Sequence, residues 1–382
     1  MHHYIKKFYR LDALSGLLIC RIYLLRFLLK HLSDRFVTSI NLKLYNMTYK
    51  AIKIYAMFFF FILAIPLFTS CEDEDEDLIG NWVELSDFDG MPRGDAVGFA
   101  IGTNGYVGTG YDEDGDRLND FWQYNALKNT WTQKADFPGV GRNGAIGFGT
   151  DSKGYIGTGY DGKNKLKDFY EYDPNTNTWT KKADFAGSER YGASAMSINN
   201  KGYVTCGYNG NNLKDFWQYS PETDTWEQKT SMGGSKRQYA TTFVIDGIGY
   251  LLTGYDNGYE DDVWAYDPDS DSWTEKRKIS DDTDYDFDDE YINIVGSGKV
   301  GFAINGKGYL ATGGSSTGKY VWEYDPTEDL WTARTEFEGY ARTKAVGFVI
   351  NNVGYVATGS SGGTYYDDIW GFYPQNEFNE DD

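Results

Sequence analysis

The feature that most constrains this chain is a unit of about fifty residues that recurs six times between residues 81 and 374. Each unit contains a Gly-Tyr pair, and consecutive pairs lie 46 to 59 residues apart. A repeat of this period indicates one supersecondary unit copied along an axis or around a ring. The glycines of the six pairs are Gly105, Gly154, Gly202, Gly249, Gly308 and Gly354.

Four β-strands are predicted within each unit. In the first unit a short apolar segment at residues 96–99 precedes the Gly-Tyr pair, Phe-Trp-x-Tyr follows at residues 121–124, and Trp131 begins the last strand. Aromatic residues make up 17% of the chain and it has 45 glycines, a composition that suits short strands joined by tight turns. Four strands at this period predict an all-β protein, a six-bladed β-propeller.

One position of the predicted first strand holds only small residues in all six units. Sheets that converge on a common axis crowd one another there, and small side chains relieve that crowding. The pattern therefore favours a ring over a linear stack. The residues are Gly98, Gly147, Ala195, Thr242, Gly301 and Gly347.

The unit resembles the kelch repeat, in which a glycine doublet follows the second strand and a spaced Tyr and Trp come later. The resemblance covers residues 81–374 and implies a kelch-type propeller of four antiparallel strands per blade across residues 80–382. Only Gly313-Gly314 keeps the doublet, and Ser360 replaces its second glycine in the last unit. In the other four units a tyrosine stands there: Tyr111, Tyr160, Tyr208 and Tyr255.

Ring closure is predicted from a missing strand. The sixth unit ends after Trp370 without its fourth-strand tryptophan, whereas Trp82 precedes the first complete unit in a matching context. We therefore expect the strand around Trp82 to complete the last blade and pair with the strand at Trp370. Such a closure removes two open sheet edges.

The charge of the chain is divided between two regions. Residues 1–70 carry a net charge of +8, and residues 71–382 carry −29. A body this acidic repels nucleic acid and anionic membrane surfaces at long range, so no nucleic-acid partner is expected.

The three histidines all precede residue 71, which leaves the body without the usual ligand for copper or zinc. We expect no metal and no cofactor, and the resemblance to the copper enzyme galactose oxidase ends at the fold. The three cysteines are too scattered for a disulfide framework, and Cys206 is interpreted as a buried small residue.

The first eighty residues divide into three predicted segments. Residues 47–70 have the basic start and apolar core of a signal peptide, and the sequence before Cys71 resembles the lipoprotein box. The resemblance implies that Cys71 is lipidated, in an outer-membrane lipoprotein of the cell envelope; an uncleaved membrane anchor is the alternative. Residues 1–46 are interpreted as surplus sequence that results from a start codon assigned too early. Residues 71–79 are interpreted as an acidic tether. An acidic run after the lipidated Cys resembles the surface-export signal of Bacteroidetes lipoproteins.

Candidate ligand-binding residues lie in two sets of loops that direction alternation places at one end of the propeller. The four tyrosines begin the loops between second and third strands, and arginines lie in the connections between blades. Phenols and guanidiniums there could stack on sugar rings or bind carboxylates. The alternative is structural: an arginine at this position belongs to the kelch consensus and bonds neighbouring carbonyls. The fifth unit has Gly296 instead; the arginines are Arg93, Arg142, Arg190, Arg237 and Arg342.

The fifth unit also carries an acidic insertion at residues 281–291, in which seven of eleven residues are Asp or Glu. Alternating carboxylates could hold calcium, but the segment lacks the turn glycine and the closing Glu of an EF-hand loop. We interpret it as a solvated acidic loop and as the place where partner-specific recognition would reside.

Three functions are consistent with these observations. The first is a lipid-anchored binding module that presents one propeller face to a glycan or protein. The second is a sugar isomerase similar to the sialic-acid mutarotase (N-acetylneuraminate epimerase) built on a kelch propeller, with Glu189 beside Arg190 as one pair chosen on proximity; no other catalytic residue is assigned. The third is a structural subunit of a surface complex.

Overall fold

The computed structural model describes residues 79–281, 283–284, 287–289, 291, 294–313 and 318–379. The predictions for residues 1–46, for the signal peptide, for Cys71 and for most of the tether lie outside these residues. No helix among the described residues is long and apolar enough to cross a membrane.

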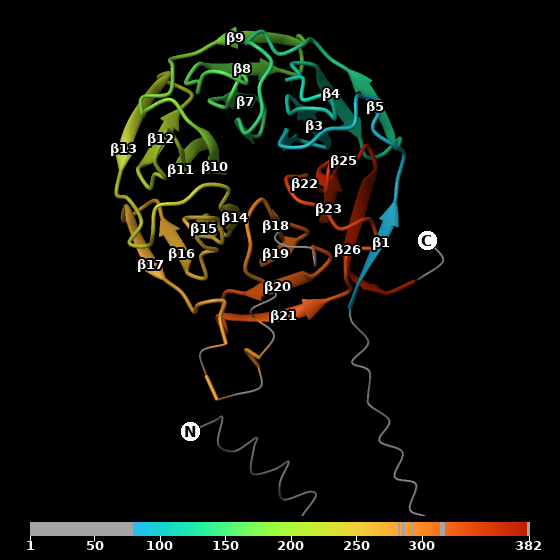
Figure 1. The fold of residues 1–382 in the computed structure, drawn as a ribbon, viewed down its shortest axis with the longest axis vertical. Helices are drawn as coiled ribbons and strands as arrows, with labels where there is room; N and C mark the ends of the chain where they lie inside the picture. Colours follow the sequence, from blue (N-terminus) through green and yellow to red (C-terminus); the bar gives the residue numbers. More distant parts are fainter. Residues whose placement is uncertain are drawn as a thin grey trace, which may run out of the picture. The chain divides into compact units, whose positions relative to one another are not determined.

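Six four-stranded antiparallel sheets surround a common axis, as Figure 1 shows. Blade one consists of β2 (Val97–Ile101), β3 (Asn104–Gly108), β4 (Phe121–Asn125) and β5 (Thr130–Gln133). Blade two consists of β6 (Ile146–Gly149), β7 (Gly154–Gly157), β8 (Phe169–Asp173) and β9 (Thr178–Lys181). Blade three consists of β10 (Tyr191–Ile198), β11 (Lys201–Tyr208), β12 (Phe216–Ser220) and β13 (Thr225–Lys229).

The second half of the ring continues the same order. Blade four consists of β14 (Thr241–Ile245), β15 (Ile248–Leu252), β16 (Val263–Asp267) and β17 (Ser272–Glu275). Blade five consists of β18 (Val300–Ile304), β19 (Lys307–Ala311), β20 (Val321–Asp325) and β21 (Leu330–Arg334). Blade six consists of β22 (Val346–Ile350), β23 (Val353–Ala357), β26 (Ile369–Glu377) and β1 (Ile79–Glu84), with the small hairpin β24 (Ser360–Ser361) and β25 (Thr364–Tyr365) between β23 and β26.

The predicted closure is confirmed. Strand β1 pairs antiparallel with β26, and Trp82 lies opposite Phe372 while Glu84 lies opposite Trp370. The Trp82 side chain is fully buried between Phe372 and Phe337 of the preceding blade, at ring-centroid distances of 4.7 and 4.9 Å. The last blade is therefore built from both ends of the propeller sequence, which joins the first and last repeats.

The glycine of each Gly-Tyr pair is required by the neighbouring blade. A Cβ added at Gly202 would lie 2.0 Å from the ring of Phe148, and one at Gly154 would lie 2.4 Å from Phe99. In both cases the ring belongs to the first strand of the preceding blade. The tyrosine that follows stacks on the phenylalanine of its own first strand, as Tyr155 does on Phe148 at 5.0 Å. Alternation of a glycine and an aromatic ring is therefore how adjacent blades interlock.

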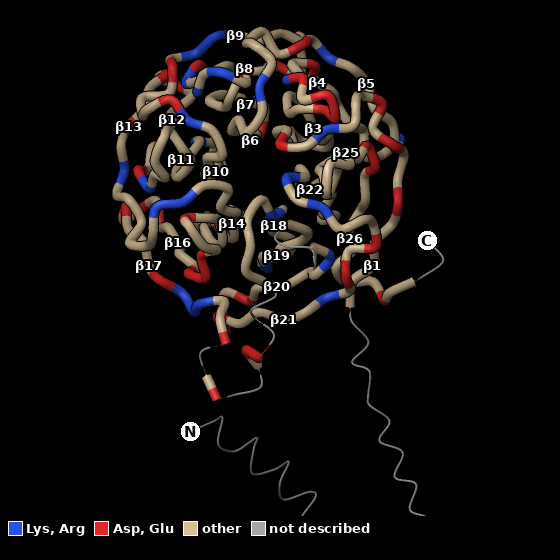
Figure 2. The backbone as a smooth tube through the Cα atoms, viewed as in Figure 1, with Lys and Arg blue, Asp and Glu red and all other residues tan. Residues whose placement is uncertain are grey.

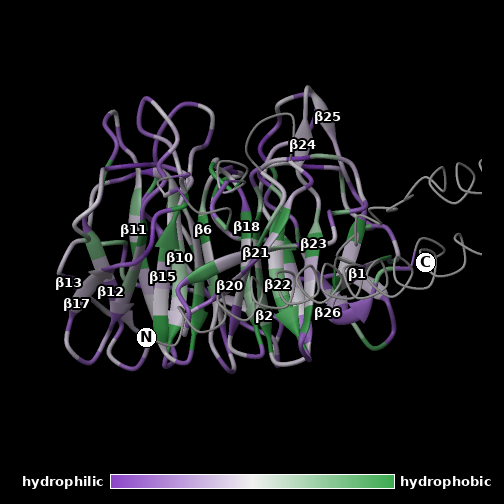
Figure 3. Ribbon diagram, turned by 90° about the horizontal axis from the view of Figure 1, so that it is seen from below, coloured by the Kyte–Doolittle hydropathy of each residue, from purple (hydrophilic) through white to green (hydrophobic). Residues whose placement is uncertain are grey.

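The small residues of the first strands face the preceding blade near the axis, where the prediction placed the crowding. A Cβ at Gly347 would lie 2.1 Å from Val300, and one at Gly98 would lie 2.5 Å from Val346. Hydrophobic residues fill the strands while polar residues occupy the loops at both ends (Figure 3). Acidic and basic residues alternate around the whole ring instead of forming one patch, as Figure 2 shows.

Candidate functional site

The two predicted sets of loops do meet at one end of the propeller. Isolated β-bridges pair Tyr111 with Gly94, Tyr160 with Asn143 and Gln238 with Tyr255. Each bridge joins a second-to-third loop to the connection that enters the same blade. We call this end the loop face; the hairpin β24–β25 projects from it in Figure 3.

The five predicted arginines lie beneath the loop face, where all are buried and none is more than 2% exposed. Each guanidinium pairs with an aspartate that precedes the third strand of the same blade. It also donates to a backbone carbonyl at the end of the second strand or just after it. In blade two, Arg142 Nη1 lies 2.5 Å from Asp168 Oδ1 and 2.8 Å from the Thr158 carbonyl oxygen. The five pairs are Arg93–Asp120, Arg142–Asp168, Arg190–Asp215, Arg237–Asp262 and Arg342–Asp368.

Each of these arginines also bonds its own loop. Arg142 Nε donates to the Val140 carbonyl at 3.0 Å, and its guanidinium lies 4.7 Å from the ring centroid of Phe137. Burial alone would raise the pKa of Asp120, but the hydrogen bonds and charge of Arg93 hold that pKa below its usual value. The arginines therefore fix the loops to the blades, and this geometry does not support the prediction that their guanidiniums contact a ligand.

A closed ring of six backbone hydrogen bonds surrounds the axis below the loop face. Each donor is the N–H of a residue at the start of the first strand of a blade or just before it. Each acceptor is the carbonyl of the equivalent residue in the preceding blade, at 2.7 to 3.1 Å. All six residues have φ between 53° and 60°, in the left-handed region. Three of the six are glycine, which adopts this conformation without steric cost. The ring consists of Asp95, Gly144, Gly192, Tyr239, Gly298 and Lys344.

The three side chains of this ring meet across the axis. The Tyr239 hydroxyl donates to Asp95 Oδ2 at 3.0 Å, and Lys344 Nζ lies 3.7 Å from the same oxygen. Lys344 Nζ also lies 4.6 Å from the ring centroid of Tyr239. Burial, followed by the charge of Asp95, raises the pKa of Tyr239 well above its usual value. These groups border an axial cavity of about 140 Å³ that Lys299 also lines.

The predicted tyrosines lie on the loop face and retain exposed surface, which reaches 42% for Tyr255. They contact further tyrosines that the sequence analysis did not select. Tyr191 lies 5.5 Å from Tyr160 and 5.6 Å from Tyr208, and Tyr111 lies 5.4 Å from Tyr365, as ring-centroid distances. The structure therefore places these tyrosines, but not the arginines, where a ligand can reach them.

A second set of residues that sequence reasoning missed lies opposite these tyrosines in the same loops and reaches toward the next blade. The guanidinium of Arg117 lies 5.8 Å from the ring centroid of Tyr160, and Lys165 Nζ lies 5.7 Å from that of Tyr208. At the third junction Asn212 Nδ2 donates to the Tyr255 carbonyl at 3.4 Å. The chemistry thus changes from cationic between blades one and two to neutral between blades three and four.

Arg117 differs from the five buried arginines because the described residues give it no carboxylate partner. Its Nε donates to Asn143 Oδ1 at 3.1 Å and its Nη1 donates to the Gly115 carbonyl, while Asn143 Nδ2 bonds Asp95. Its guanidinium also lies 5.8 Å from the centroid of Tyr111. A leucine directly after Arg117, Lys165 and Asn212 is the sequence signal that relates these three positions.

A groove of about 660 Å³ separates the loops of blades three and four. Its walls combine aromatic rings with side-chain amides. Asn212 Nδ2 donates to Asp256 Oδ1 at 2.8 Å, whereas Asn212 Oδ1 and Gln238 Oε1 have no partner among the described residues. We call this feature the Tyr208–Tyr255 groove; it is lined by Tyr191, Tyr208, Asn211, Asn212, Gln238 and Tyr255, among others.

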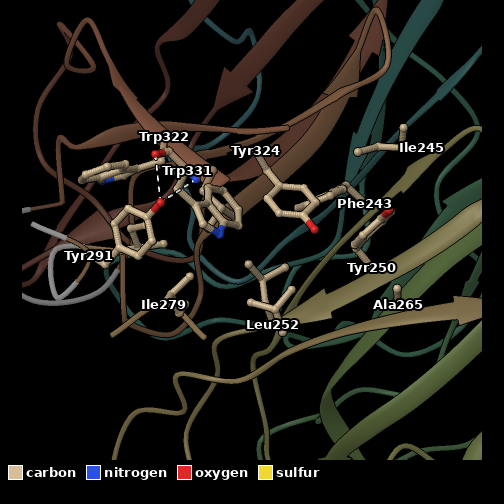
Figure 4. Close-up of a cluster of buried hydrophobic side chains, with 13 residues drawn as sticks. Phe243, Ile245, Tyr250, Leu252, Ala265, Ile279, Tyr291, Trp322, Tyr324 and Trp331 are labelled. Carbon is tan, nitrogen blue, oxygen red and sulfur yellow. Dashed lines mark hydrogen bonds between the residues drawn. The ribbon is translucent and has the colours of Figure 1, made fainter. Parts of the chain in front are cut away.

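The acidic insertion is only partly solvated, contrary to the prediction. Tyr291 is fully buried in the core of blade five, and its hydroxyl bonds the backbone of Trp331 in β21 (Figure 4). Oxygens of Asp281, Asp288 and Asp289 lie within 4.8 Å of one another, and Thr283 donates to Asp288 at 2.7 Å. Carboxylates alone do not make a calcium site, so no metal is assigned here.

Cys206 is fully buried, and burial raises the pKa of its thiol to about 11. A thiol that stays protonated is a poor nucleophile, as the sequence interpretation expected. The proposed Glu189–Arg190 pair is not formed as a site, because Arg190 is buried against Asp215 while Glu189 is exposed.

Comparisons with known proteins agree with this architecture. Residues 155–284 match the family model of the KLHDC2/KLHL20/DRC7 Kelch-repeats domain, so this chain contains a Kelch-repeat domain. A solved structure of YjhT shares the fold with a TM-score of 0.62 and 18% sequence identity, over 75% of this chain and 95% of YjhT. No curated protein matches the chain.

Proposed function

We propose that this propeller is a glycan-binding module whose ligand lies in the Tyr208–Tyr255 groove. The observation that carries the proposal is the juxtaposition, in one groove, of tyrosine rings that retain exposed surface with several side-chain amides. The C–H face of a sugar ring packs on an aromatic ring, while its hydroxyls need both donors and acceptors. A groove of about 660 Å³ has the size of known small-ligand sites.

The neutral character of the groove favours a neutral glycan. Asn211, Asn212 and Gln238 supply amides, and the two charged lining residues, Lys236 and Asp256, have opposite signs. A charged ligand would need a better-defined counter-charge to offset the loss of its hydration.

The test is a titration of the full chain with a panel of neutral and acidic oligosaccharides, measured by calorimetry. Tyr255→Ala and Gln238→Ala should each weaken binding about tenfold, which corresponds to about 1.4 kcal/mol. Tyr340→Ala is the matched control, because Tyr340 is 72% exposed and lies outside the lining of this groove. Binding that survives both groove substitutions, or an absence of binding to every glycan, would overturn the proposal.

A second candidate is a sugar isomerase similar to the sialic-acid mutarotase, and Arg117 is the observation that favours it. Its Nε and Nη1 already donate to Asn143 and to the Gly115 carbonyl, and its Nη2 group has no acceptor among the described residues, so Nη2 can donate to a sugar carboxylate. Anomer exchange of N-acetylneuraminate, followed by NMR with the wild-type chain and Arg117→Gln, separates this activity from binding alone.

We further propose that the propeller is displayed on a lipid anchor at the cell envelope. Support comes from the sequence of residues 47–71 alone, with its apolar core and Cys71. Metabolic labelling with an alkynyl fatty acid should mark the wild-type chain and not Cys71→Ala. If no sugar stabilises the protein against heat, a structural subunit that binds a protein partner becomes the better description.

A further inference from the structure

Lys299 occupies a position that is alanine in the other five blades. This position directly follows the backbone ring around the axis, at the start of the first strand. The equivalent residues of the other five blades, which line the same cavity, are Ala96, Ala145, Ala193, Ala240 and Ala345. A long cationic side chain among five methyl groups at the centre of a repeat protein requires an explanation.

Part of the explanation is a substitution of one donor for another. Lys299 Nζ donates to the Thr312 carbonyl at 3.0 Å, and the equivalent carbonyl in blade two, that of Thr158, accepts from Arg142. Blade five has Gly296 in place of the arginine and Tyr320 in place of its aspartate. Lys299 thus satisfies the orphaned carbonyl, but without the carboxylate that balances each arginine.

The amine is consequently a partly buried base beside a cavity. Among the described residues it has no ion pair, and burial lowers its pKa to about 8. It lines the axial cavity of about 140 Å³ together with Asp95, Tyr239 and Lys344. A lysine that is partly neutral near pH 7 is a nucleophile toward carbonyl carbon, whereas an ordinary surface lysine is almost fully protonated.

We propose that Lys299 is a carbonyl-reactive amine that captures small aldehydes in the axial cavity as imines. The nitrogen lone pair attacks the aldehyde carbon to form a C–N bond while the carbonyl π bond breaks, and one proton passes from nitrogen to oxygen to give a carbinolamine. The C–O bond then breaks, and the hydroxyl leaves as water with the second proton of the nitrogen, which leaves the C=N double bond. The step needs no oxidant or reductant. A cavity of about 140 Å³ has room for an aldehyde of two or three carbons.

The proposal is tested by trapping the imine in the full chain with glycolaldehyde and sodium cyanoborohydride at pH 7, followed by peptide mapping. A lysine with a pKa near 8 is about one-tenth neutral at this pH, against fewer than about one in a thousand for a pKa of 10.5. Lys299 should therefore be labelled at least about tenfold faster than the exposed Lys236. Labelling of Lys236 at an equal or greater rate would overturn the proposal.

A second arm tests the assignment to this side chain. Lys299→Arg, which keeps a donor for the Thr312 carbonyl, should remove the fast-labelled peptide and leave melting unchanged. The first arm is performed on the wild-type chain, so the proposal can be overturned without any variant that folds.

Discussion

Blade five and the other five blades satisfy the same backbone carbonyl with different side chains. In blades one to four and six, a buried arginine bonds that carbonyl, holds its own connection and pairs with an aspartate. In blade five Lys299 bonds the carbonyl and the connection is instead held by the acidic insertion. The comparison teaches that the arginine is a structural device: where another segment holds the loop, both arginine and aspartate are dispensable.

The insertion holds blade five through Tyr291. Its ring lies in an edge-to-face contact with Trp322 at 5.9 Å, and its hydroxyl both donates to the Trp331 carbonyl and accepts from the Trp331 N–H (Figure 4). Ile279 and Ile294 are fully buried beside it in the same cluster. Tyr291 and Ile294 thus take the place of the single arginine, whereas Ile279 occupies the position that Phe137 has at the junction before blade two.

The largest expected effect follows from removing this anchor. Tyr291→Ala deletes a fully buried ring and should lower the free energy of unfolding by about 3–5 kcal/mol, as measured by urea denaturation. Tyr291→Phe keeps the ring and loses two hydrogen bonds, so a smaller loss of about 1–2 kcal/mol is expected. Tyr259→Ala is the control, since Tyr259 is 48% exposed and should change stability by less than about 0.5 kcal/mol. A Tyr291→Ala protein as stable as this control would show that the insertion is not an anchor.

Removal of one arginine should be nearly as costly. Arg142→Met leaves Asp168 partly buried without its partner and two carbonyls without this donor, and should cost about 3 kcal/mol. Lys299→Met leaves one carbonyl without its donor and leaves no carboxylate unpaired. A loss of about 1 kcal/mol in the free energy of unfolding is therefore expected. Denaturation midpoints measured at one pH give both losses in the free energy of unfolding. Their difference shows how much more Arg142 stabilises the fold than Lys299 does. Equal losses would mean that the two side chains contribute equally.

A transplant sharpens the same comparison. The triple substitution Arg142→Gly, Ala145→Lys and Asp168→Tyr gives blade two the residues of blade five at the three equivalent positions. It should recover about half of the loss of Arg142→Met, because no carboxylate is left unpaired and the introduced lysine can reach the Thr158 carbonyl, but no insertion holds the loop. A triple variant less stable than Arg142→Met would mean that the three residues do not form an exchangeable unit.

The fold could be predicted from the sequence because its contacts repeat. Gly202 accommodates Phe148 and Gly347 accommodates Val300, and equivalent contacts recur around the ring, so each leaves a residue type at a fixed spacing. Trp82 could be assigned to the last blade because the sixth unit lacks its final tryptophan. Repetition makes such constraints visible without any structure.

The site could be predicted only in part, for the same reason. The arginines recur in five blades, so the sequence analysis selected them as candidate ligand-binding residues. A residue that recurs in most repeats more often stabilises the fold than contacts a ligand. Their aspartates recur as well, and the joint loss at Gly296 and Tyr320 was the available sign of pairing. Arg117 and Asn212 occupy one structural position with different residue types in loops of different length, so only the folded chain shows that both reach the next blade.

The last expected effect is a pH dependence that originates in blade five. The folded-state pKa of Lys299 is lowered to about 8 from 10.5, so between these values the unfolded chain binds more protons. The free energy of unfolding should therefore rise with pH in this window, by at most about 1.4 kcal/mol per pH unit. Arginine pairs do not titrate there, so the arginines of the other five blades contribute no such rise.

This dependence is isolated by comparing the wild-type chain with Lys299→Met in urea denaturation from pH 8 to pH 9.5. Asp95, Tyr239 and Lys344 line the same cavity and are common to both proteins, so their contributions cancel. The upper limit stays below the range in which the buried tyrosines matter: burial raises the pKa of Tyr106 to about 12, and such groups affect stability only as pH rises through 10 and above. Parallel stability curves for the two proteins would mean that Lys299 is not a buried base, and would also remove the physical reason for its reactivity toward aldehydes.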